Sequence, residues 1–362
     1  MSGLRVAIAH DYLTQRGGAE RVVLAMARTF PGAPVHTALY DPQGTFPEFR
    51  DLRVHESWLR RVPGLRHRHR LGLPLYPLAF STLRPDADVV VCSSSGWAHG
   101  IGGGHPTVVY CHTPARWLYD AGAFAPSGPA RVGLALLGPP LRRWDRRAAH
   151  RATRYLANDA GVAERISRAY GIEAEVLHPP LGIQPEGQRA PVPGIGDGIV
   201  LSVARLLPYK HVDAVVAAAV HLPERQVVVV GDGPDRTRLR ASAPANVTFL
   251  DAVTDEELRW LYSRAGVLAA PAEEDFGLTP VEAAAFGVPT VARRAGGHLT
   301  TVLDGRTGRL VDDLRPQALA AALAEALAAP WDPAVLRGHA NDLSEAAFAR
   351  RLREVVEEIS GG

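Results

Sequence analysis

The sequence predicts an α/β protein built from two doubly wound domains. Short apolar runs of strand length alternate with amphipathic helical stretches, and this alternation is typical of parallel sheets with helices on both faces. The chain has 362 residues, which is long for one core and fits two domains of about 150 to 200 residues each. A Pro- and Gly-rich stretch at 181–198 has neither the helical nor the strand periodicity of apolar residues and predicts a linker between the domains.

The composition is that of a folded protein with little net charge. Hydrophobic residues make up 46% and charged residues 22%, so the chain can bury sizeable cores. The net charge of +2 is too small to indicate a nucleic-acid partner. Cys92 and Cys111 each lie in an apolar run, which favours buried free thiols. No apolar run approaches the length of a membrane span and no signal peptide is recognisable, so we expect a cytoplasmic protein, soluble or peripheral to a membrane.

The first domain is predicted over residues 1–180. A strand at 4–9, a loop and a helix at 19–30 form its opening unit. Further strands are predicted at 34–39, 88–92, 107–111, 154–157 and 175–180. The first loop contains Gly17 and Gly18 but no G-x-G-x-x-G fingerprint. The two glycines are explained equally well by a tight turn and by a loop that faces a ligand.

The second domain is predicted over 199–340, followed by a closing helix over 341–362. Its strands are predicted at 199–204, 226–230, 247–250, 266–270 and 309–311. Helices are predicted at 213–220, 279–287 and 316–328. Thr254 and Glu257 have the spacing of a capping box. The closing helix carries one apolar face, formed by Phe348, Leu352, Val355 and Val356.

Residues 271–301 contain the strongest indication of a binding site. A buried strand leads into a loop, and a helix start signal follows at Thr279. The loop contains Glu274, Phe276, Gly277 and Leu278. These residues lie at the carboxyl end of a strand, where open parallel sheets bind ligands. Free N–H groups at the helix start suit a sugar hydroxyl or a phosphate, and the carboxylates of Glu274 and Glu282 can accept hydrogen bonds from sugar hydroxyls. Glu282 has a competing interpretation as a capping-box residue that reaches back to the Thr279 N–H.

Three other polar residues follow predicted strands. Arg205 and Lys210 flank the turn after the strand at 199–204, where two cations beside a helix start form an anion site. Solvent-exposed charge explains them equally well. His112 closes the strand at 107–111. A lone histidine is more often structural, but its position at a carboxyl end favours a binding role.

Four segments resemble motifs of the retaining glycosyltransferases of family 4. EEDFGLTPVEAAAFGVPTVARRAGG resembles the donor-sugar motif, ARLLPYKHVD the phosphate-binding segment, CHTPARWLYD the loop with the sugar-contacting histidine, and HDYLTQRGGAERVV the amino-terminal loop. The resemblance covers nearly the whole chain. It implies the GT-B fold, in which two Rossmann-like domains face a cleft and the closing helix crosses back to the first domain.

The resemblance also implies roles for these residues. Glu274 would hold sugar hydroxyls and Glu282 the ribose, while Arg205 and Lys210 would bind the diphosphate. Phe276, Gly277, Leu278 and Thr279 would contribute to donor binding. Gly17 and Gly18 would let the chain approach the donor diphosphate and the acceptor, and His112 would contact the sugar. Val253 is a candidate contact to the nucleotide base. Asp251 stands where related sequences usually have Gly, so the resemblance does not determine which base the donor carries.

The implied activity is retaining hexosyl transfer from a nucleotide-sugar to a glycan, lipid-linked or small-molecule acceptor. The co-substrate would be GDP- or UDP-linked, with no cofactor and no metal. The motifs are most similar to mannosyl-type members that use GDP-sugars in polysaccharide assembly; UDP-glucose and UDP-N-acetylglucosamine are rival donors. A nucleotide-sugar 2-epimerase and a non-catalytic sugar-nucleotide binding subunit are the alternatives from other classes.

Two further patterns have competing explanations. Asp86 and Asp88 resemble a metal-binding D-x-D, but solvated carboxylates are ordinary at a strand start. Arginines cluster in two stretches, one with Arg60, Arg61, Arg66, Arg68 and Arg70, the other with Arg142, Arg143, Arg146 and Arg147. Solvated faces explain most such runs. The sharper hypothesis is contact with anionic lipid or with an acceptor that carries phosphate.

Overall fold

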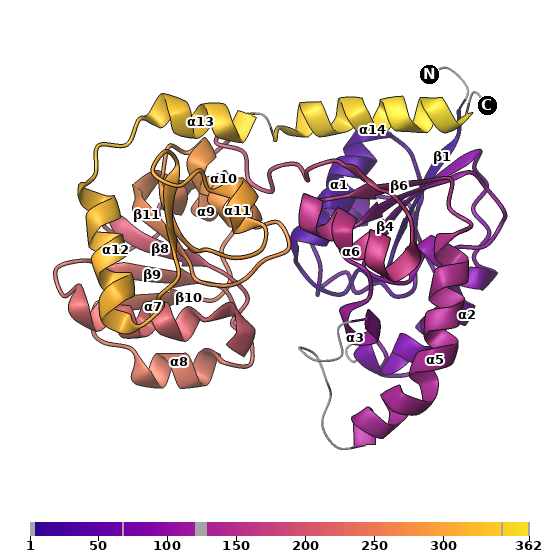
Figure 1. The fold of residues 1–362 in the computed structure, drawn as a ribbon, viewed down its shortest axis with the longest axis horizontal. Coiled ribbons are helices and arrows are strands. Elements are labelled where there is room, and N and C mark those ends of the chain that lie inside the picture. Colours follow the sequence, from indigo (N-terminus) through magenta and orange to yellow (C-terminus); the bar gives the residue numbers. More distant parts are fainter. Residues whose placement is uncertain (1–3, 67–68, 120–128, 342, 361–362) are drawn as a thin grey trace. The chain divides into compact units, whose positions relative to one another are not determined.

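The fold consists of two α/β units, each with a parallel sheet (Figure 1). The computed structural model describes residues 4–66, 69–119, 129–341 and 343–360. The first unit comprises Met1–Pro180 with Glu345–Gly362, and the second comprises Leu181–Ser344. The prediction of two doubly wound α/β domains is therefore confirmed.

The first sheet has the strand order β3-β2-β1-β4-β5-β6-β7, and all its pairs are parallel. Its strands are β1 Val6–His10, β2 Val35–Thr37, β3 Val54–Glu56, β4 Val89–Ser94, β5 Thr107–Cys111, β6 Arg154–Ala157 and β7 Glu175–Val176. The chain winds outward from β1 to β3 and then returns to β4 on the other side of β1. The winding direction therefore reverses between β1 and β4, and such switch points are where open sheets bind ligands.

Helices cover this sheet, and the closing helix is one of them. The α-helices are α1 Gly18–Thr29, α2 Tyr76–Thr82, α3 Arg116–Tyr119, α5 Pro129–Ala149, α6 Ala160–Tyr170 and α14 Glu345–Ser360. The short 3-10 helices are η1 Pro47–Asp51, η2 Trp58–Arg61, η3 His69–Leu75 and η4 Ala98–Gly100. Helix α14 lies along α1 (Figure 1), and Phe348 and Leu352 join the core that contains Val22 and Met26. The prediction that the closing helix crosses back to the first domain is confirmed.

The second sheet has the strand order β10-β9-β8-β11-β12-β13, again all parallel. Its strands are β8 Ile199–Val203, β9 Val227–Val230, β10 Val247–Leu250, β11 Ala265–Ala270, β12 Thr290–Arg293 and β13 Gly308–Val311. Its helices are η5 Pro208–Lys210, α7 Val212–Ala218, η6 Ala219–His221, α8 Arg236–Ser242, α9 Asp255–Arg264, α10 Leu278–Ala285, α11 His298–Thr301, α12 Pro316–Ala328 and α13 Pro333–Asn341. The switch point here lies between β8 and β11.

The structure corrects several details of the prediction. Strands β3 and β12 were not predicted. Helix α10 starts after Gly277, whose φ of 83° is in the left-handed region, and no side chain caps it. The capping-box interpretation of Glu282 is therefore wrong, whereas the Thr254–Glu257 capping box is present. Cys92 and Cys111 are free and buried, as predicted. Across the described ranges, no single helix is both long and apolar enough to cross a membrane.

Candidate functional site

Two charged side chains meet at the switch point of the second sheet. Lys210 ends η5, which follows β8, and Glu274 follows β11. The Lys210 Nζ donates a hydrogen bond of 2.5 Å to Glu274 Oε1. The two side chains are 11% and 29% exposed, so the pair borders the solvent. The structure therefore brings together two of the predicted site residues at a position suited to ligand binding.

Tyr209 contacts both predicted cations of this turn. Arg205 is exposed, and its Nη2 donates to the Tyr209 hydroxyl at 3.3 Å. The Lys210 Nζ lies 5.2 Å from the centre of the Tyr209 ring. The sequence analysis did not identify Tyr209, although its position between the two cations in one turn was a usable signal.

The loop after β11 is held by close backbone contacts. The Gly297 N–H donates to the Glu274 carbonyl at 2.8 Å. A Cβ on Gly296 would lie 2.2 Å from that carbonyl oxygen, and one on Gly297 would lie 2.3 Å from the Phe276 backbone, so both positions require glycine. The Phe276 side chain is buried in a core cluster, which leaves only its backbone for a ligand. Gly277, Leu278 and Thr279 are partly exposed at the start of α10.

Glu282 lies one turn into α10 and is buried. It is 5% exposed, and its Oε2 accepts a hydrogen bond of 2.8 Å from the Tyr262 hydroxyl. The Tyr262 ring in turn stacks on Phe286, with ring centres 5.2 Å apart. Tyr262 was not predicted, because it comes from α9 and no sequence pattern links it to Glu282.

Beside Gly277 lies His298, a third residue that was not predicted from the sequence. A Cβ on Gly277 would lie 2.6 Å from the His298 ring, so this glycine is required by space as well as by its φ. Burial lowers the pKa of His298. Its ring Nδ1 lies 3.3 Å from the Arg293 carbonyl and must donate to it, because a carbonyl only accepts. His298 is therefore a neutral, buried group that supports the loop.

Asp251 and Val253 follow β10, and Val253 is the predicted contact to the nucleotide base. Val253 is partly buried against the core cluster that contains Leu258 and Leu261. Asp251 forms ion pairs with Arg236 and with Arg240, the latter at 3.1 Å. The side chain that replaces the usual glycine is thus held by two arginines.

At the switch point of the first sheet, Asp11 organises the loop that follows β4. Its carboxylate accepts hydrogen bonds from the N–H groups of Ser95 at 2.6 Å, Trp97 at 3.0 Å and Ala98 at 2.7 Å. Asp11 is only 3% exposed. Gly17 and Gly18 follow in the same β1–α1 connection, where Gly17 is the N-cap of α1. Asp11 was not identified from the sequence, since its partners lie more than 80 residues away.

His112 follows β5 and is half-buried. Its Nε2 lies 2.8 Å from the Ser93 hydroxyl. Burial, reinforced by the nearby charge of His10, lowers the pKa of His112 to about 3. His112 is therefore a neutral imidazole at physiological pH, hydrogen-bonded through one ring nitrogen.

Residues of the D-x-D pattern and of the first arginine-rich stretch form ion pairs. Arg5 pairs with Asp86 at 2.5 Å and with Asp88 at 2.8 Å. Among the described residues, no group of three or more His, Cys, Asp and Glu side chains is arranged to hold a metal ion. Arg66 pairs with Glu56 at 2.9 Å, while Arg60 and Arg61 are exposed on η2. Arg68 lies outside the described residues, and the side chain of Arg70 is not described.

Comparison with known proteins decides the family. The family model Glycosyltransferase Family 4 matches residues 16–184, and the model Glycosyl transferases group 1 matches residues 189–350. The chain belongs to glycosyltransferase family 4. Its two parallel-sheet units agree with the fold of solved GT-B glycosyltransferases. HepE of Anabaena, solved in complex with UDP and glucose, matches with a TM-score of 0.74 over 98% of this chain and 99% of that chain, at 18% identity. This likeness shows the GT-B fold.

Two curated relatives from mycobacteria are similar to this chain in sequence. One is the GDP-mannose-dependent alpha-(1-6)-phosphatidylinositol monomannoside mannosyltransferase of Mycolicibacterium smegmatis, 32% identical over 254 residues, with 56% of this chain and 66% of that protein covered. The other is the D-inositol 3-phosphate glycosyltransferase of Mycobacterium avium, 32% identical over 265 residues, with 62% of this chain and 61% of that protein covered. The matches thus span a little under two thirds of the length of these relatives.

Proposed function

We propose that this family 4 chain is a retaining, metal-independent glycosyltransferase that moves a hexose from a nucleotide-sugar to an acceptor hydroxyl. The observation that carries the proposal is the 2.5 Å pair of Lys210 and Glu274 at the second switch point. In a nucleotide-sugar, the anionic diphosphate is bonded directly to the hydroxyl-rich ring. A cation beside a carboxylate matches that junction, because the cation pairs with phosphate and the carboxylate accepts sugar hydroxyls.

In this proposal the second unit binds the donor. Arg205 and Lys210 stabilise the negative charge that grows on the leaving diphosphate, a task that a metal ion performs in other enzymes. Glu274 accepts hydrogen bonds from the sugar ring and Glu282 from the ribose. The backbone of Phe276, Gly277, Leu278 and Thr279 contributes N–H groups at the start of α10, and Val253 contacts the base.

The first unit contributes Gly17, Gly18 and His112 in the same proposal. His112 contacts the reacting sugar, and the glycines let the diphosphate and the acceptor approach the β1–α1 loop. Since Glu274 is engaged by Lys210, we assign no carboxylate nucleophile. Retention then follows from a short-lived, oxocarbenium-like ion pair that is attacked on the face from which the leaving group departs.

For the donor we propose a GDP-sugar, with mannose as the hexose. The M. smegmatis relative is named as dependent on GDP-mannose, whereas HepE was solved with UDP and glucose, so a UDP-sugar is the rival. Thermal-shift measurements with GDP and UDP separate the two, since the nucleotide that binds the folded state raises its unfolding temperature.

Incubation with the selected nucleotide-sugar then tests the activity. Release of nucleotide together with a glycosylated acceptor or a slowly hydrolysed sugar supports the transferase. A changed sugar without release would indicate an epimerase, and binding without either product would indicate a binding subunit. Either of these outcomes would overturn the proposal.

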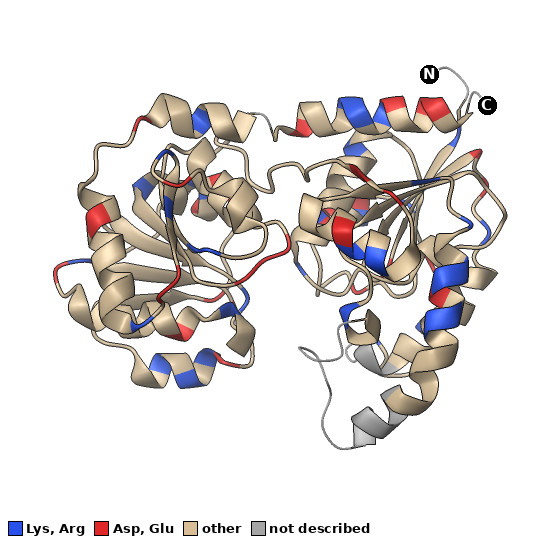
Figure 2. Cartoon of the chain, in the orientation of Figure 1, with Lys and Arg blue, Asp and Glu red and all other residues tan. Residues whose placement is uncertain are grey.

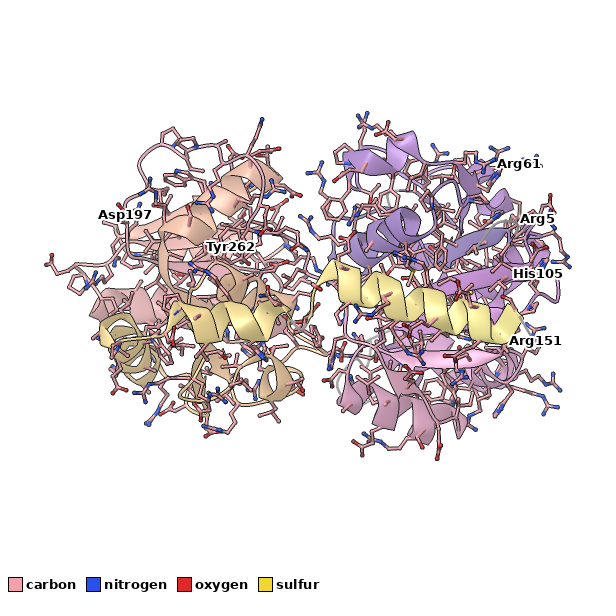
Figure 3. All side chains as sticks on the ribbon, turned by 90° about the horizontal axis from the view of Figure 1, so that it is seen from above. Arg5, Arg61, His105, Arg151, Asp197 and Tyr262 are labelled. Carbon is pink, nitrogen blue, oxygen red and sulfur yellow. The ribbon has the colours of Figure 1, made fainter. Side chains whose placement is uncertain are left out.

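We propose a phosphate-bearing acceptor, lipid-linked or small, reached from a peripheral position on an anionic membrane. The names of both mycobacterial relatives include an inositol phosphate group. Helix α5, on which Figure 2 shows a run of basic residues, exposes Leu136 by 72% and Leu137 by 45%. Arg61 lies at the outer edge of the first unit (Figure 3).

Not all of the arginines are available for this contact. Arg142 and Arg146 donate to backbone carbonyls at 3.0 Å. Arg143, Arg146 and Arg147 are exposed. Co-sedimentation with phosphatidylglycerol vesicles at low salt tests the membrane contact, with phosphatidylcholine vesicles as the control. Equal sedimentation with both would exclude an electrostatic membrane contact.

A further inference from the structure

A continuous chain of polar groups runs through the first switch point. It begins at Glu20 on α1, passes through His10 at the end of β1 and Ser93 on β4, and ends at His112 after β5. The His10 Nε2 lies 3.8 Å from Glu20 Oε1, the His10 Nδ1 lies 3.1 Å from Ser93 Oγ, and the Ser93 Oγ lies 2.8 Å from the His112 Nε2. Glu20, His10 and Ser93 are 1%, 3% and 0% exposed.

The direction of each hydrogen bond follows from the chemistry of its partners. The His10 Nδ1 also lies 3.1 Å from the Ser93 carbonyl, which only accepts, so this nitrogen carries a hydrogen. The Ser93 hydroxyl, which lies beside that donor, directs its own hydrogen to the His112 Nε2. The His112 Nε2 is therefore an acceptor, and the proton of this neutral ring resides on Nδ1.

The charged groups of this series of polar residues, Glu20 and His10, lie at the end away from His112. Both nitrogens of His10 face acceptors, Ser93 on one side and the Glu20 carboxylate on the other. Burial opposes a charge on His10, but Glu20, with smaller contributions from Asp11 and the Ser93 carbonyl, outweighs it and raises the pKa of His10. Among the residues that the structure describes, Asp11 is a second acidic group close to His10. Tyr110, whose ring centre is 5.3 Å from that of His112, is the aromatic neighbour at the outer end.

Glu20 does not have the usual role of a Glu near a helix start. It occupies the N3 position of α1, from which a Glu often caps the helix, yet neither of its oxygens makes a hydrogen bond with a residue that the structure describes. Its Oε2 lies 2.7 Å from where a Cβ on Gly17 would be. Gly17 therefore leaves room for the carboxylate, whose Oε1 lies 3.8 Å from the His10 Nε2.

We propose that Glu20 and His10 are positioning residues that keep a positive charge two hydrogen bonds behind His112, where this charge adds to the effect of burial in keeping His112 neutral with its Nδ1–H directed away from Ser93. The proposal rests on the proposed function, in which His112 contacts the reacting sugar. A sugar that develops positive charge would be repelled by an imidazolium, whereas a neutral ring can donate a hydrogen bond without that penalty. The charge on His10 prevents a second protonation nearby.

The test combines histidine NMR with the pH dependence of transfer in the full chain. In the wild type, selectively ¹⁵N-labelled His112 should remain the neutral Nδ1–H tautomer from pH 8 to pH 5, and kcat should show no acidic limb from it. In Glu20→Gln, His10 should become neutral, because burial then dominates its pKa. His112 should consequently take up a proton at higher pH than in the wild type. The kcat deficit should be small at pH 8 and should grow as the pH falls toward the raised pKa of His112, with KM nearly unchanged.

Further variants separate this effect from a loss of structure. His10→Gln removes the charge from the other end of the pair and should produce the same acidic limb, so it replaces Glu20→Gln if that variant fails to fold. Glu48→Gln, the same change at an exposed position of the first unit, should follow the wild-type profile. A constant kcat deficit at every pH, or an unchanged His112 titration in both variants, would overturn the proposal. If the wild type releases no nucleotide while His112 behaves as described, the proposed function fails and the charge arrangement stands.

Discussion

The two units have the same winding and differ in how they hold the polar residues at their switch points. In the first unit, His10, Asp11 and Ser93 are at most 3% exposed. His10 is hydrogen-bonded to Ser93, and Asp11 to the loop that follows Ser93. In the second unit, Lys210 and Glu274 are 11% and 29% exposed and pair with each other. One switch point is a buried network and the other is an ion pair at the edge of the solvent.

This difference separates stability from ligand binding. Buried polar groups are costly to alter, because a partner left without its hydrogen bond pays the full desolvation penalty. A partly exposed ion pair contributes little to the folded state, so its charges can be exchanged for those of a ligand. We therefore expect changes at the first switch point to act mainly on folding or on the charge state of His112, and changes at the second to act mainly on turnover.

The largest effect is expected for Glu274→Gln. Loss of this carboxylate removes the group that accepts hydrogen bonds from the sugar hydroxyls, and it also removes the partner of Lys210. The rate of transfer should fall by about 100-fold or more, as for other electrostatic groups in active sites. The free energy of unfolding should change by less than about 1 kcal/mol, since the pair borders the solvent. Steady-state kinetics and urea unfolding of the same preparation measure the two quantities.

Glu273→Gln provides the matched control, because it makes the same change at the exposed neighbouring position. It should retain most of the wild-type kcat. Equal losses in the two variants, or a large loss of stability in Glu274→Gln, would contradict the division between the two units.

The opposite outcome is expected for Asp11→Asn in the first unit. The carboxylate accepts three backbone N–H groups, and an asparagine would turn an N–H₂ donor toward at least one of them. The first unit should lose about 2 kcal/mol of stability or more, the cost of an unsatisfied buried donor. Hydrogen exchange at Ser95, Trp97 and Ala98 should accelerate, while exchange in β8 to β11 stays at its wild-type rate.

Asp51→Asn repeats this substitution at an exposed position of the same unit and should leave the exchange rates unchanged. If Asp11→Asn shows unchanged amide hydrogen exchange in the loop after β4, the buried hydrogen bonds of Asp11 do not stabilise that loop.

The same contrast explains which features could be predicted from the sequence. Lys210 and Glu274 each lie in the connection that follows an apolar strand, so their place near a carboxyl edge is a local property of the chain. His10 and Ser93 become neighbours only because β1 pairs with β4, with His10 opposite Ser93. That register depends on the strand order, which local patterns do not contain. The Glu20 carboxylate is an extreme case, since a Glu near a helix start is ordinarily a capping residue or a solvated charge.

Two errors in the fold have equally local causes. Strand β12, Thr290–Arg293, lies inside the donor-motif segment, and only Val291 and Ala292 in it are apolar, so no apolar run marks it as a strand. Helix α10 starts at Leu278 rather than at Thr279, because Gly277 adopts a left-handed conformation that no sequence rule required. The closing helix was predictable, since its apolar face repeats over 16 residues.

The smallest predicted effect concerns acid stability and the buried histidines of the first unit. Burial, with a smaller contribution from His55, lowers the pKa of His36 to about 4. A lowered histidine pKa means that the unfolded chain binds a proton that the folded chain does not, so stability is lost as the pH falls below about 6.5. At pH 5 the loss due to His36 should be about 2 kcal/mol. His36→Phe, which keeps a ring against His55 at a similar stacking distance, should remove this part of the pH dependence.

Urea unfolding at pH 8, 6.5 and 5 measures the slope, and hydrogen exchange of β2 assigns it to the first unit. His150→Phe, the same substitution at an exposed position of that unit, should keep the wild-type slope. His112, with its pKa lowered to about 3, should cause a residual loss in His36→Phe over the same pH range. An unchanged slope in His36→Phe would mean that this histidine is not held neutral by burial.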